Sequence, residues 1–225
     1  MHHVVDTHVR GKVLLVVYTN ELVPVETSIQ TMEQLLGKDN YQVVDFDLEF
    51  TSGRARQDQK VAFAQLSVQH DIHVYHYHLA TRSFERFARF INNPYYSFAA
   101  VDTTNDLKVI NVSGLTSQNL VNIRDHYKIW ASTNNRQNSL VDLTSAIIDP
   151  YYMKMKHESK KDKNAWHSAW DQRLDEEQVK YATKEAYTSY KMYMRIVDMR
   201  KCLRPSLDEG SSNREVAGGS QELDN

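Results

Sequence analysis

The 225-residue chain has a single cysteine, Cys202, so it can form no disulfide bond within itself. Such a composition fits a reducing compartment, or a fold that needs no covalent cross-link. No stretch approaches 18 consecutive apolar residues, so we expect no membrane-spanning helix. The opening segment, MHHVVDTHVRG, lacks the apolar run of a signal peptide. These absences predict a protein of the nucleus or cytoplasm that is neither secreted nor bound to a membrane.

A strong charge of one sign is also missing. The 27 Lys and Arg residues balance 29 Asp and Glu residues, which gives a formal net charge of −2. This balance excludes a chain that is basic overall, although a local basic patch is enough to bind a phosphate backbone. Hydrophobic residues make up 41% and charged residues 25%, as is ordinary for a globular protein. The length allows one well-buried α/β core, and more than one full domain is not expected.

Apolar periodicity predicts strands and helices that alternate along most of the chain. Strands are expected at 12–19, 42–50, 60–68, 72–78, 96–101 and 119–123. Helices are expected at 23–37, 81–93, 104–115 and 175–203. After Pro205 the chain is rich in Ser, Gly, Glu and Asn, which predicts a disordered tail. We therefore divide the chain into an N-terminal extension (1–11), one α/β domain (12–204) and a C-terminal tail (205–225).

The stretch VVDFDLEF at 43–50 places three acidic residues inside a predicted strand. Side chains two positions apart in a strand point to the same face, so Asp45, Asp47 and Glu49 are expected to crowd together. Like charges at that spacing repel, and their desolvation is costly unless a cation lies between them. Two interpretations are open: a solvated edge strand with a polar face, or a metal site.

Two further acidic residues bear on that choice. Asp106 lies in the helix that directly follows the strand 96–101, and Glu185 lies one helical turn after Tyr181. Paired carboxylates suit Mg²⁺ or Mn²⁺, because these cations take several hard oxygen ligands. An Asp-x-Glu pair alone is a weak signal, since such triplets arise by chance in most proteins.

Three motifs in order carry a resemblance to a known family. The sequence has Asp-Leu-Glu-Phe at 47–50, then Asp106 within YSFAAVDTTNDLKVI, and finally LDEEQVKYATKEAYTSY from residue 174. In this order and spacing the chain resembles the Werner-type 3′–5′ exonuclease domain, notably its plant forms, within the RNase D-like DEDDy superfamily. The resemblance covers about residues 12–200. It implies an α/β fold of the ribonuclease H type, with a mixed sheet flanked by helices.

The resemblance also implies roles for individual residues. The catalytic set and its metal ligands for two Mg²⁺ or Mn²⁺ ions would be Asp47, Glu49, Asp106 and Glu185, joined by Tyr181, which would orient the attacking water. On the substrate side it places Leu48 and Phe50 of the first motif, with Phe50 either stacking on the 3′ nucleotide or packing in the core. The lysine-rich run 154–163 is either a solvated loop or a phosphate contact through Lys160 and Lys161.

The chain departs from the family pattern at four positions. Glu185 stands where the family has Asp, Asp45 and Asp102 stand at positions that usually hold Gly, and Asn122 replaces an Asp. The longer Glu185 side chain shifts its carboxylate by one methylene and is expected to weaken activity. The first functional hypothesis is a metal-dependent exonuclease acting on the 3′ end of DNA or RNA. The alternative is a catalytically weakened domain that binds nucleic acid or a protein partner in a regulatory role. The sequence does not choose between DNA and RNA or fix an oligomeric state.

Overall fold

A computed structural model describes residues 2–9, 11–51, 59–82, 84–130, 139–154 and 170–202. The tail expected at 205–225 lies outside the described residues. Among the described residues, no helix is long and apolar enough to cross a membrane.

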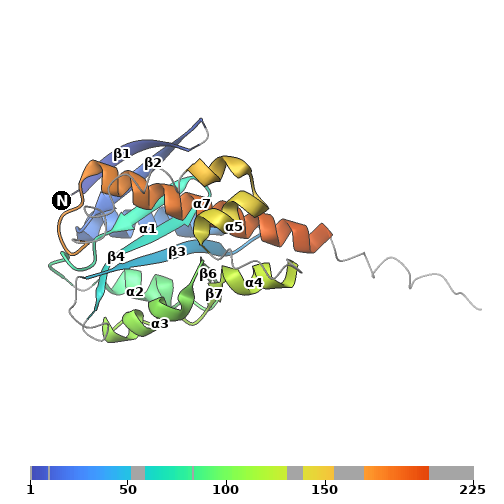
Figure 1. Ribbon diagram of the computed structural model, residues 1–225. Coiled ribbons are helices and arrows are strands. Elements are labelled where there is room, and N and C mark those ends of the chain that lie inside the picture. Colours follow the sequence, from blue (N-terminus) through green and yellow to red (C-terminus); the bar gives the residue numbers. More distant parts are fainter. Residues whose placement is uncertain are drawn as a thin grey trace, which may run out of the picture.

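A seven-stranded mixed sheet forms the centre of the molecule, in the order β1-β2-β5-β4-β3-β6-β7 (Figure 1). Its strands are β1 (His2–Val9), β2 (Lys12–Thr19), β3 (Val43–Phe50), β4 (Val61–Val68), β5 (Asp71–Tyr75), β6 (Ser97–Ala100) and β7 (Leu120–Asn122). The pairs β1–β2, β5–β4 and β4–β3 are antiparallel, whereas β2–β5, β3–β6 and β6–β7 are parallel. This is the mixed α/β sheet predicted from the sequence.

Helices cover both faces of the sheet. They are α1 (Leu22–Leu36), α2 (Glu85–Ile91), α3 (Thr103–Val112), α4 (Ile123–Trp130), α5 (Leu140–Ile147), the short 3₁₀ helix η2 (Pro150–Tyr152) and α7 (Glu176–Cys202). Helices α1, α2 and α3 pack on one face, while α7 runs across the other face beside α5 (Figure 1). Every residue of β4 is buried, because this central strand is covered on both sides.

The strands and helices that the sequence predicts are present, with shifted ends. The largest shift is at the helix expected at 81–93, where α2 begins only at Glu85. One strand was not predicted: residues 2–9, assigned to an N-terminal extension, form β1 and pair along their length with β2. Gly11, with φ of 76°, lies in the turn between them, in a conformation that disfavours other residues.

The alternation of side chains along β3 decides which residues face α7. Val44, Phe46 and Leu48 are buried in the core formed with α1, α2 and α3. Val43 packs instead with residues of α5 and α7. Because successive strand residues point to opposite faces, the odd-numbered acidic residues of β3 point toward α7. The sheet thus carries an apolar face and an acidic stripe on the same strand.

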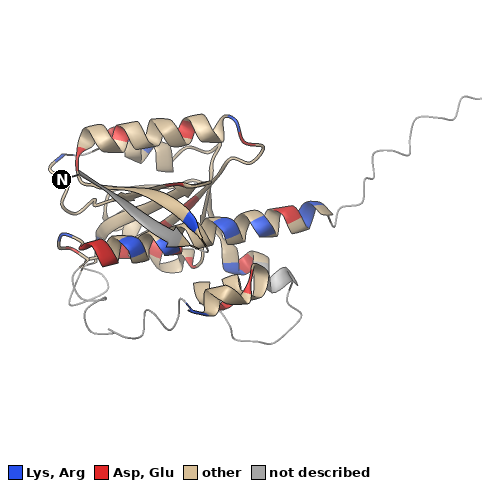
Figure 2. Cartoon of the chain, turned by 90° about the horizontal axis from the view of Figure 1, so that it is seen from above, with Lys and Arg blue, Asp and Glu red and all other residues tan. Residues whose placement is uncertain are grey.

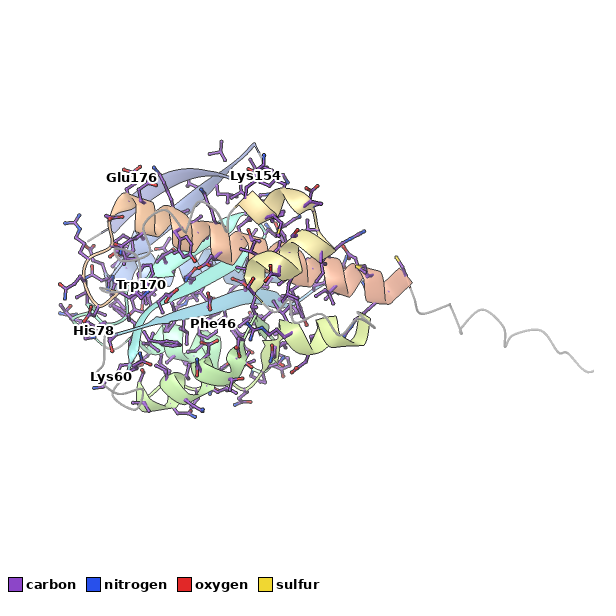
Figure 3. The ribbon with its side chains drawn as sticks, in the orientation of Figure 1. Phe46, Lys60, His78, Lys154, Trp170 and Glu176 are labelled. Atoms are coloured by element: carbon purple, nitrogen blue, oxygen red, sulfur yellow. The ribbon has the colours of Figure 1, made fainter. Side chains whose placement is uncertain are left out.

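Phe46 anchors this strand from the apolar side. Its side chain is fully buried (Figure 3). It meets the ring of Phe98 edge-on, with 5.8 Å between ring centroids. We expect Phe46→Ala to lower the free energy of unfolding by about 3–5 kcal/mol, because it opens a cavity that the packed core cannot fill. Urea denaturation would measure this loss. Tyr95→Ala is the control, since Tyr95 is 82% exposed and its removal should cost less than about 0.5 kcal/mol. A loss below about 1 kcal/mol for Phe46→Ala would contradict this packing.

Candidate active site

Helix α7 presents a row of polar residues that matches the acidic stripe of β3. Tyr181, Glu185 and Ser189 recur every four residues and so lie on one side of the helix. Four helical residues advance about 6 Å, and two strand residues advance about 6.6 Å. The two rows therefore stay in step, and each acidic residue of β3 has one polar residue of α7 opposite it.

Electrostatic interactions confirm this correspondence. After burial and Glu185, the charges of Glu49 and Asp47 also raise the pKa of the Tyr181 hydroxyl. Glu185 interacts most strongly with Asp47. At the inner end of the row, the Ser189 hydroxyl lies beside the carboxyl group of Asp45. The motif residues Asp47, Glu49, Tyr181 and Glu185 thus lie together, as the resemblance implies.

The start of α7 is fixed by hydrogen bonds and packing. Asp175 Oδ1 accepts from the backbone N–H of Gln178 at 2.8 Å, and Gln178 Oε1 accepts from that of Asp175 at 3.0 Å. This reciprocal pair is a capping box, which satisfies backbone donors at a helix start. Acidic residues fill the first turn of α7 and basic residues its last turn, as the helix dipole favours (Figure 2).

A buried tyrosine ties the segment before α7 to the sheet. The Tyr18 hydroxyl on β2 accepts from the Leu174 backbone N–H at 3.0 Å and lies 2.8 Å from His76 Nδ1. Burial lowers the pKa of His76 to about 4, so the imidazole is neutral at pH 7. Its Nδ1 can therefore accept a hydrogen bond from the Tyr18 hydroxyl. The register of α7 against β3 therefore rests on a buried contact as well as on apolar packing.

Helix α3 supplies the remaining motif residue, Asp106, which is 4% exposed. Asp102 caps this helix by accepting from the Thr104 backbone N–H at 3.2 Å and forms an ion pair with Arg124 of α4. Burial acts to raise the pKa of Asp102, but the hydrogen bonds to Thr104 and the contacts with Arg124 together outweigh it, so the pKa lies below its usual value. The charge of Asp102 nevertheless helps to raise the pKa of Asp106. Asp102 therefore adds negative charge near Asp106 while it caps the start of α3.

The motif carboxylates hold their protons more tightly than free carboxyl groups. Burial, with a smaller contribution from Asp47, raises the pKa of both Asp106 and Glu185 to about 8. Burial also raises the pKa of Asp47 to about 6. The pKa of Glu49 is raised well above its usual value, first by burial and then by the charges of Asp47, Glu185 and Asp106. Asp47, Glu49 and Glu185 keep some solvent contact, but protein atoms crowd most of their surroundings.

Tyr181 donates a hydrogen bond to Glu185 Oε1 at 2.6 Å. Burial first, and then the Glu185 carboxylate, raise the pKa of the tyrosine, so its hydroxyl stays protonated at neutral pH. The two residues lie one turn apart on α7, and the glutamate side chain is long enough to reach the end of the tyrosine ring. Replacing the usual Asp by Glu thus coincides with a direct contact between two motif residues.

These residues suit a divalent cation in their chemistry. All donors are oxygen atoms, as Mg²⁺ and Mn²⁺ prefer, and the buried Asp106 Oδ2 has no hydrogen-bond partner. In the described residues, however, no three His, Cys, Asp or Glu side chains are already placed to hold one ion. Rotation of side chains would have to close the ligand set around a cation.

The residues assigned to the substrate side are placed less clearly. The Leu48 side chain is buried in the core on the face away from α7, and Phe50 packs against that same core. For Phe50 this matches the core-packing interpretation. Lys160 and Lys161 lie outside the described residues. Sequence reasoning missed Ser189, although its spacing of four from Glu185 is the signal that finds it.

Comparison with known proteins identifies the family. A family model described as 3′–5′ exonuclease matches residues 22–200. The chain belongs to the 3′–5′ exonuclease family. No curated protein matches the sequence.

Several solved structures share the fold of this exonuclease domain. The EXO domain of Aedes aegypti Nibbler has a TM-score of 0.59 at 14% identity, with 80% of this chain and 87% of that chain covered. The catalytic core of Trypanosoma brucei RRP6 has a TM-score of 0.62 at 15% identity and covers 82% and 47%. Escherichia coli RNase D, described as an exoribonuclease involved in structured RNA processing, has a TM-score of 0.59 at 14% identity and covers 79% and 44%.

These neighbours establish a ribonuclease H-like, DEDD-type exonuclease fold. The chain spans less than half the length of the RRP6 and RNase D chains it matches. The narrower Werner-type resemblance, and the subclass defined by Tyr181, stay hypotheses.

The raised carboxyl pKa values predict how stability depends on pH without divalent cations. Glu185 and Asp106 titrate near pH 8 when folded, against 4.5 and 3.8 for free groups, so the folded state binds more protons. Stability must then fall as pH rises through this range. Between pH 6.5 and 8, above the usual histidine pKa, we expect the Tm in a chelator to fall by about 4–8 °C.

Differential scanning fluorimetry would measure this dependence. Glu185→Gln, which removes one of the carboxyl groups with a raised pKa, should flatten the curve, and excess Mg²⁺ should abolish it. A Tm that stays level or rises over this interval in the chelated wild type would contradict the electrostatics of the site.

Proposed function

We propose that the protein is a metal-dependent exonuclease that hydrolyses phosphodiester bonds at the 3′ end of nucleic acid. The observation that carries this proposal is the meeting of the β3 and α7 rows, where burial raises the pKa of Glu49 and Glu185 and the charge of Asp47 raises both further. Burying several carboxylates together is costly without a counterion, and a divalent cation would relieve their repulsion. A purely structural role offers no comparable compensation.

Two divalent ions, Mg²⁺ or Mn²⁺, would be held by Asp47, Glu49, Asp106 and Glu185. When bound, they would supply an activated water and stabilise the negative charge that develops on the phosphate. The protein's own residues do the rest of the work. The carboxylates come from a rigid central strand and from two helices with fixed starts, so few degrees of freedom remain to be ordered.

In this proposal, Tyr181 would donate a hydrogen bond that orients the attacking water. In the structure, the Tyr181 hydroxyl donates its hydrogen bond to Glu185 Oε1. For Tyr181 to direct a water, this contact has to lengthen or be shared. We therefore propose that Glu185 weakens turnover, because binding of the cations would first have to break the hydrogen bond between Tyr181 and Glu185.

The proposed substrate is DNA or RNA with a free 3′ end. Two related observations support nucleic acid in general: the matched family acts on it, and NrnC of Brucella melitensis has been solved bound to pGG. Lys160 and Lys161 stay candidates for contacts with the phosphate backbone. Phe50 stays a candidate for stacking only through a change of its present packing.

A catalytically weakened domain that binds nucleic acid or a protein partner is the second candidate. The Tyr181–Glu185 hydrogen bond favours it, since it occupies the one hydroxyl that the reaction needs. The two candidates share the fold and differ in whether the ligand set closes productively.

Exonuclease assays with 3′-labelled single-stranded and duplex DNA and RNA separate these candidates. We expect slow digestion by the wild type, faster with Mn²⁺ than with Mg²⁺, because Mg²⁺ requires more regular octahedral geometry. Asp47→Ala should abolish it. Glu185→Asp should raise turnover roughly tenfold or more, since it shortens the side chain and frees Tyr181.

The controls make the outcome decisive. Glu177→Asp makes the same substitution on an exposed face of α7 and should leave turnover unchanged. Robust Mg²⁺-driven digestion by the wild type that Glu185→Asp lowers would show that Glu185 is the better ligand here. An absence of cleavage by every variant with either metal would favour the second candidate.

A further inference from the structure

Helix α7 is buried over most of its circumference, and the side turned away from its neighbours is basic. Lys184, Lys191 and Arg195 follow one another at spacings of seven and four residues, and all three keep contact with solvent. These spacings hold side chains on one side of a helix that advances about 16 Å over this stretch. Lys and Arg recur along the length of α7 (Figure 2). We call these three residues, together with Lys12 of β2, the basic stripe.

Lys12 joins the stripe from the neighbouring strand. Alternate residues of a strand share a face, and Leu14 packs in one core cluster with residues of α7, so Lys12 also lies on the α7 side of the sheet. Burial first, and then the charges of Lys12 and Lys191, lower the pKa of His70. The His70 ring rests in turn against Tyr187 of α7, with 5.8 Å between ring centroids. The strand and the helix therefore bring their cations to one place.

The stripe differs from the start of α7 in its lack of compensating carboxylates. There Lys180 pairs with Glu176 at 2.7 Å and with Glu177 at 3.0 Å. In the part of the chain that the structure describes, neither Lys191 nor Arg195 forms an ion pair. Like charges one turn apart destabilise a helix, and an anionic partner would offset that cost.

Asp198 limits the stripe at its far end. It lies one turn beyond Arg195, and its Oδ1 accepts a hydrogen bond from the Tyr41 hydroxyl at 3.4 Å. The basic stripe thus extends from the level of Lys184 to that of Arg195.

The absence of apolar side chains narrows the choice of partner. Among the described residues, none of the large apolar side chains that are exposed lies on α7, and Val13, beside Lys12, points to the opposite face of the sheet. Protein interfaces have an apolar core, and basic helices on membranes insert an apolar face. A phosphate backbone needs only spaced cations, because its binding is electrostatic. Nucleic acid is therefore the polyanion that fits the stripe.

The stripe begins beside the proposed active site, since Lys184 directly precedes Glu185 on α7. We propose that the basic stripe binds the phosphate backbone of the substrate strand on the 5′ side of the nucleotide that is removed. This inference rests on the proposed function, which sets where the 3′ end lies. The stripe itself uses none of the proposed metal ligands, so its binding can be measured without cleavage.

Fluorescence anisotropy of the full chain with a 5′-labelled single strand of about 16 nucleotides tests this surface in a chelator, which prevents cleavage. Lys191→Gln/Arg195→Gln should weaken binding at least roughly fivefold, to the same extent for different base sequences. The slope of log affinity against log salt should become shallower by about 0.7 for each charge removed. Arg89→Gln removes an exposed charge from α2, on the other face of the sheet, and should change neither quantity.

Two results in this assay would overturn the proposal. One is an unchanged affinity and salt slope in the double variant, or an equal loss in Arg89→Gln. The other is competition by polyglutamate as strong as that by nucleic acid of equal charge, which would assign the stripe to acidic peptides.

Digestion with Mn²⁺ separates this inference from the proposed function. The double variant should raise KM for the long strand at least roughly fivefold but not for a dinucleotide, which ends before it reaches the stripe. An equal rise for both substrates would contradict the stripe. A wild type that binds the strand with the expected salt dependence but cleaves nothing would support the stripe and contradict the exonuclease proposal.

Discussion

The constraint on which the structure depends is the burial of like charges along one face of β3. Asp45, Asp47 and Glu49 point at α7, and desolvation raises the pKa of each; the charges of acidic neighbours raise the pKa of Asp45 and Glu49 further. A core stabilised only by apolar contacts would exclude them. The strand keeps its place because its other face is fully apolar and because β4 and β6 hold it on both edges. Stability on one face thus offsets electrostatic cost on the other, and the cations of the proposed function would relieve that cost.

Helix α7 turns this stripe into a site because its repeat matches that of the strand. Tyr181 and Glu185 meet the outer two acidic residues, and Ser189 meets the inner one. A capping box and the buried Tyr18 contact fix where the helix starts, so the register does not depend on the carboxylates themselves. The positions of these side chains are therefore fixed by the surrounding fold, but the repulsion between their carboxylates is not compensated by it.

Much of this arrangement could be predicted from the sequence, for identifiable reasons. Alternation in VVDFDLEF fixes a shared face for the acidic residues, and a spacing of four fixes one for Tyr181 and Glu185. The order of the three motifs then predicts that β3, α3 and α7 contribute to one site. Strand β1 escaped prediction because HHVVDTHV has mixed polarity and gains its stability from pairing with β2. The Tyr181–Glu185 hydrogen bond depends on side-chain conformation, and the meeting of Asp45 with Ser189 depends on how α7 packs against β3. Neither is encoded in local periodicity.

The central claim is that the facing rows of β3 and α7 form a divalent-metal site. Anomalous diffraction from crystals soaked in Mn²⁺ would test it most directly, since it locates the ion without relying on turnover. The account predicts Mn²⁺ density between the two elements, within ligating distance of Asp47 and Glu185, and Tyr181 separated from Glu185 Oε1. Mn²⁺ density only elsewhere on the molecule, with the Tyr181–Glu185 hydrogen bond intact, would contradict it.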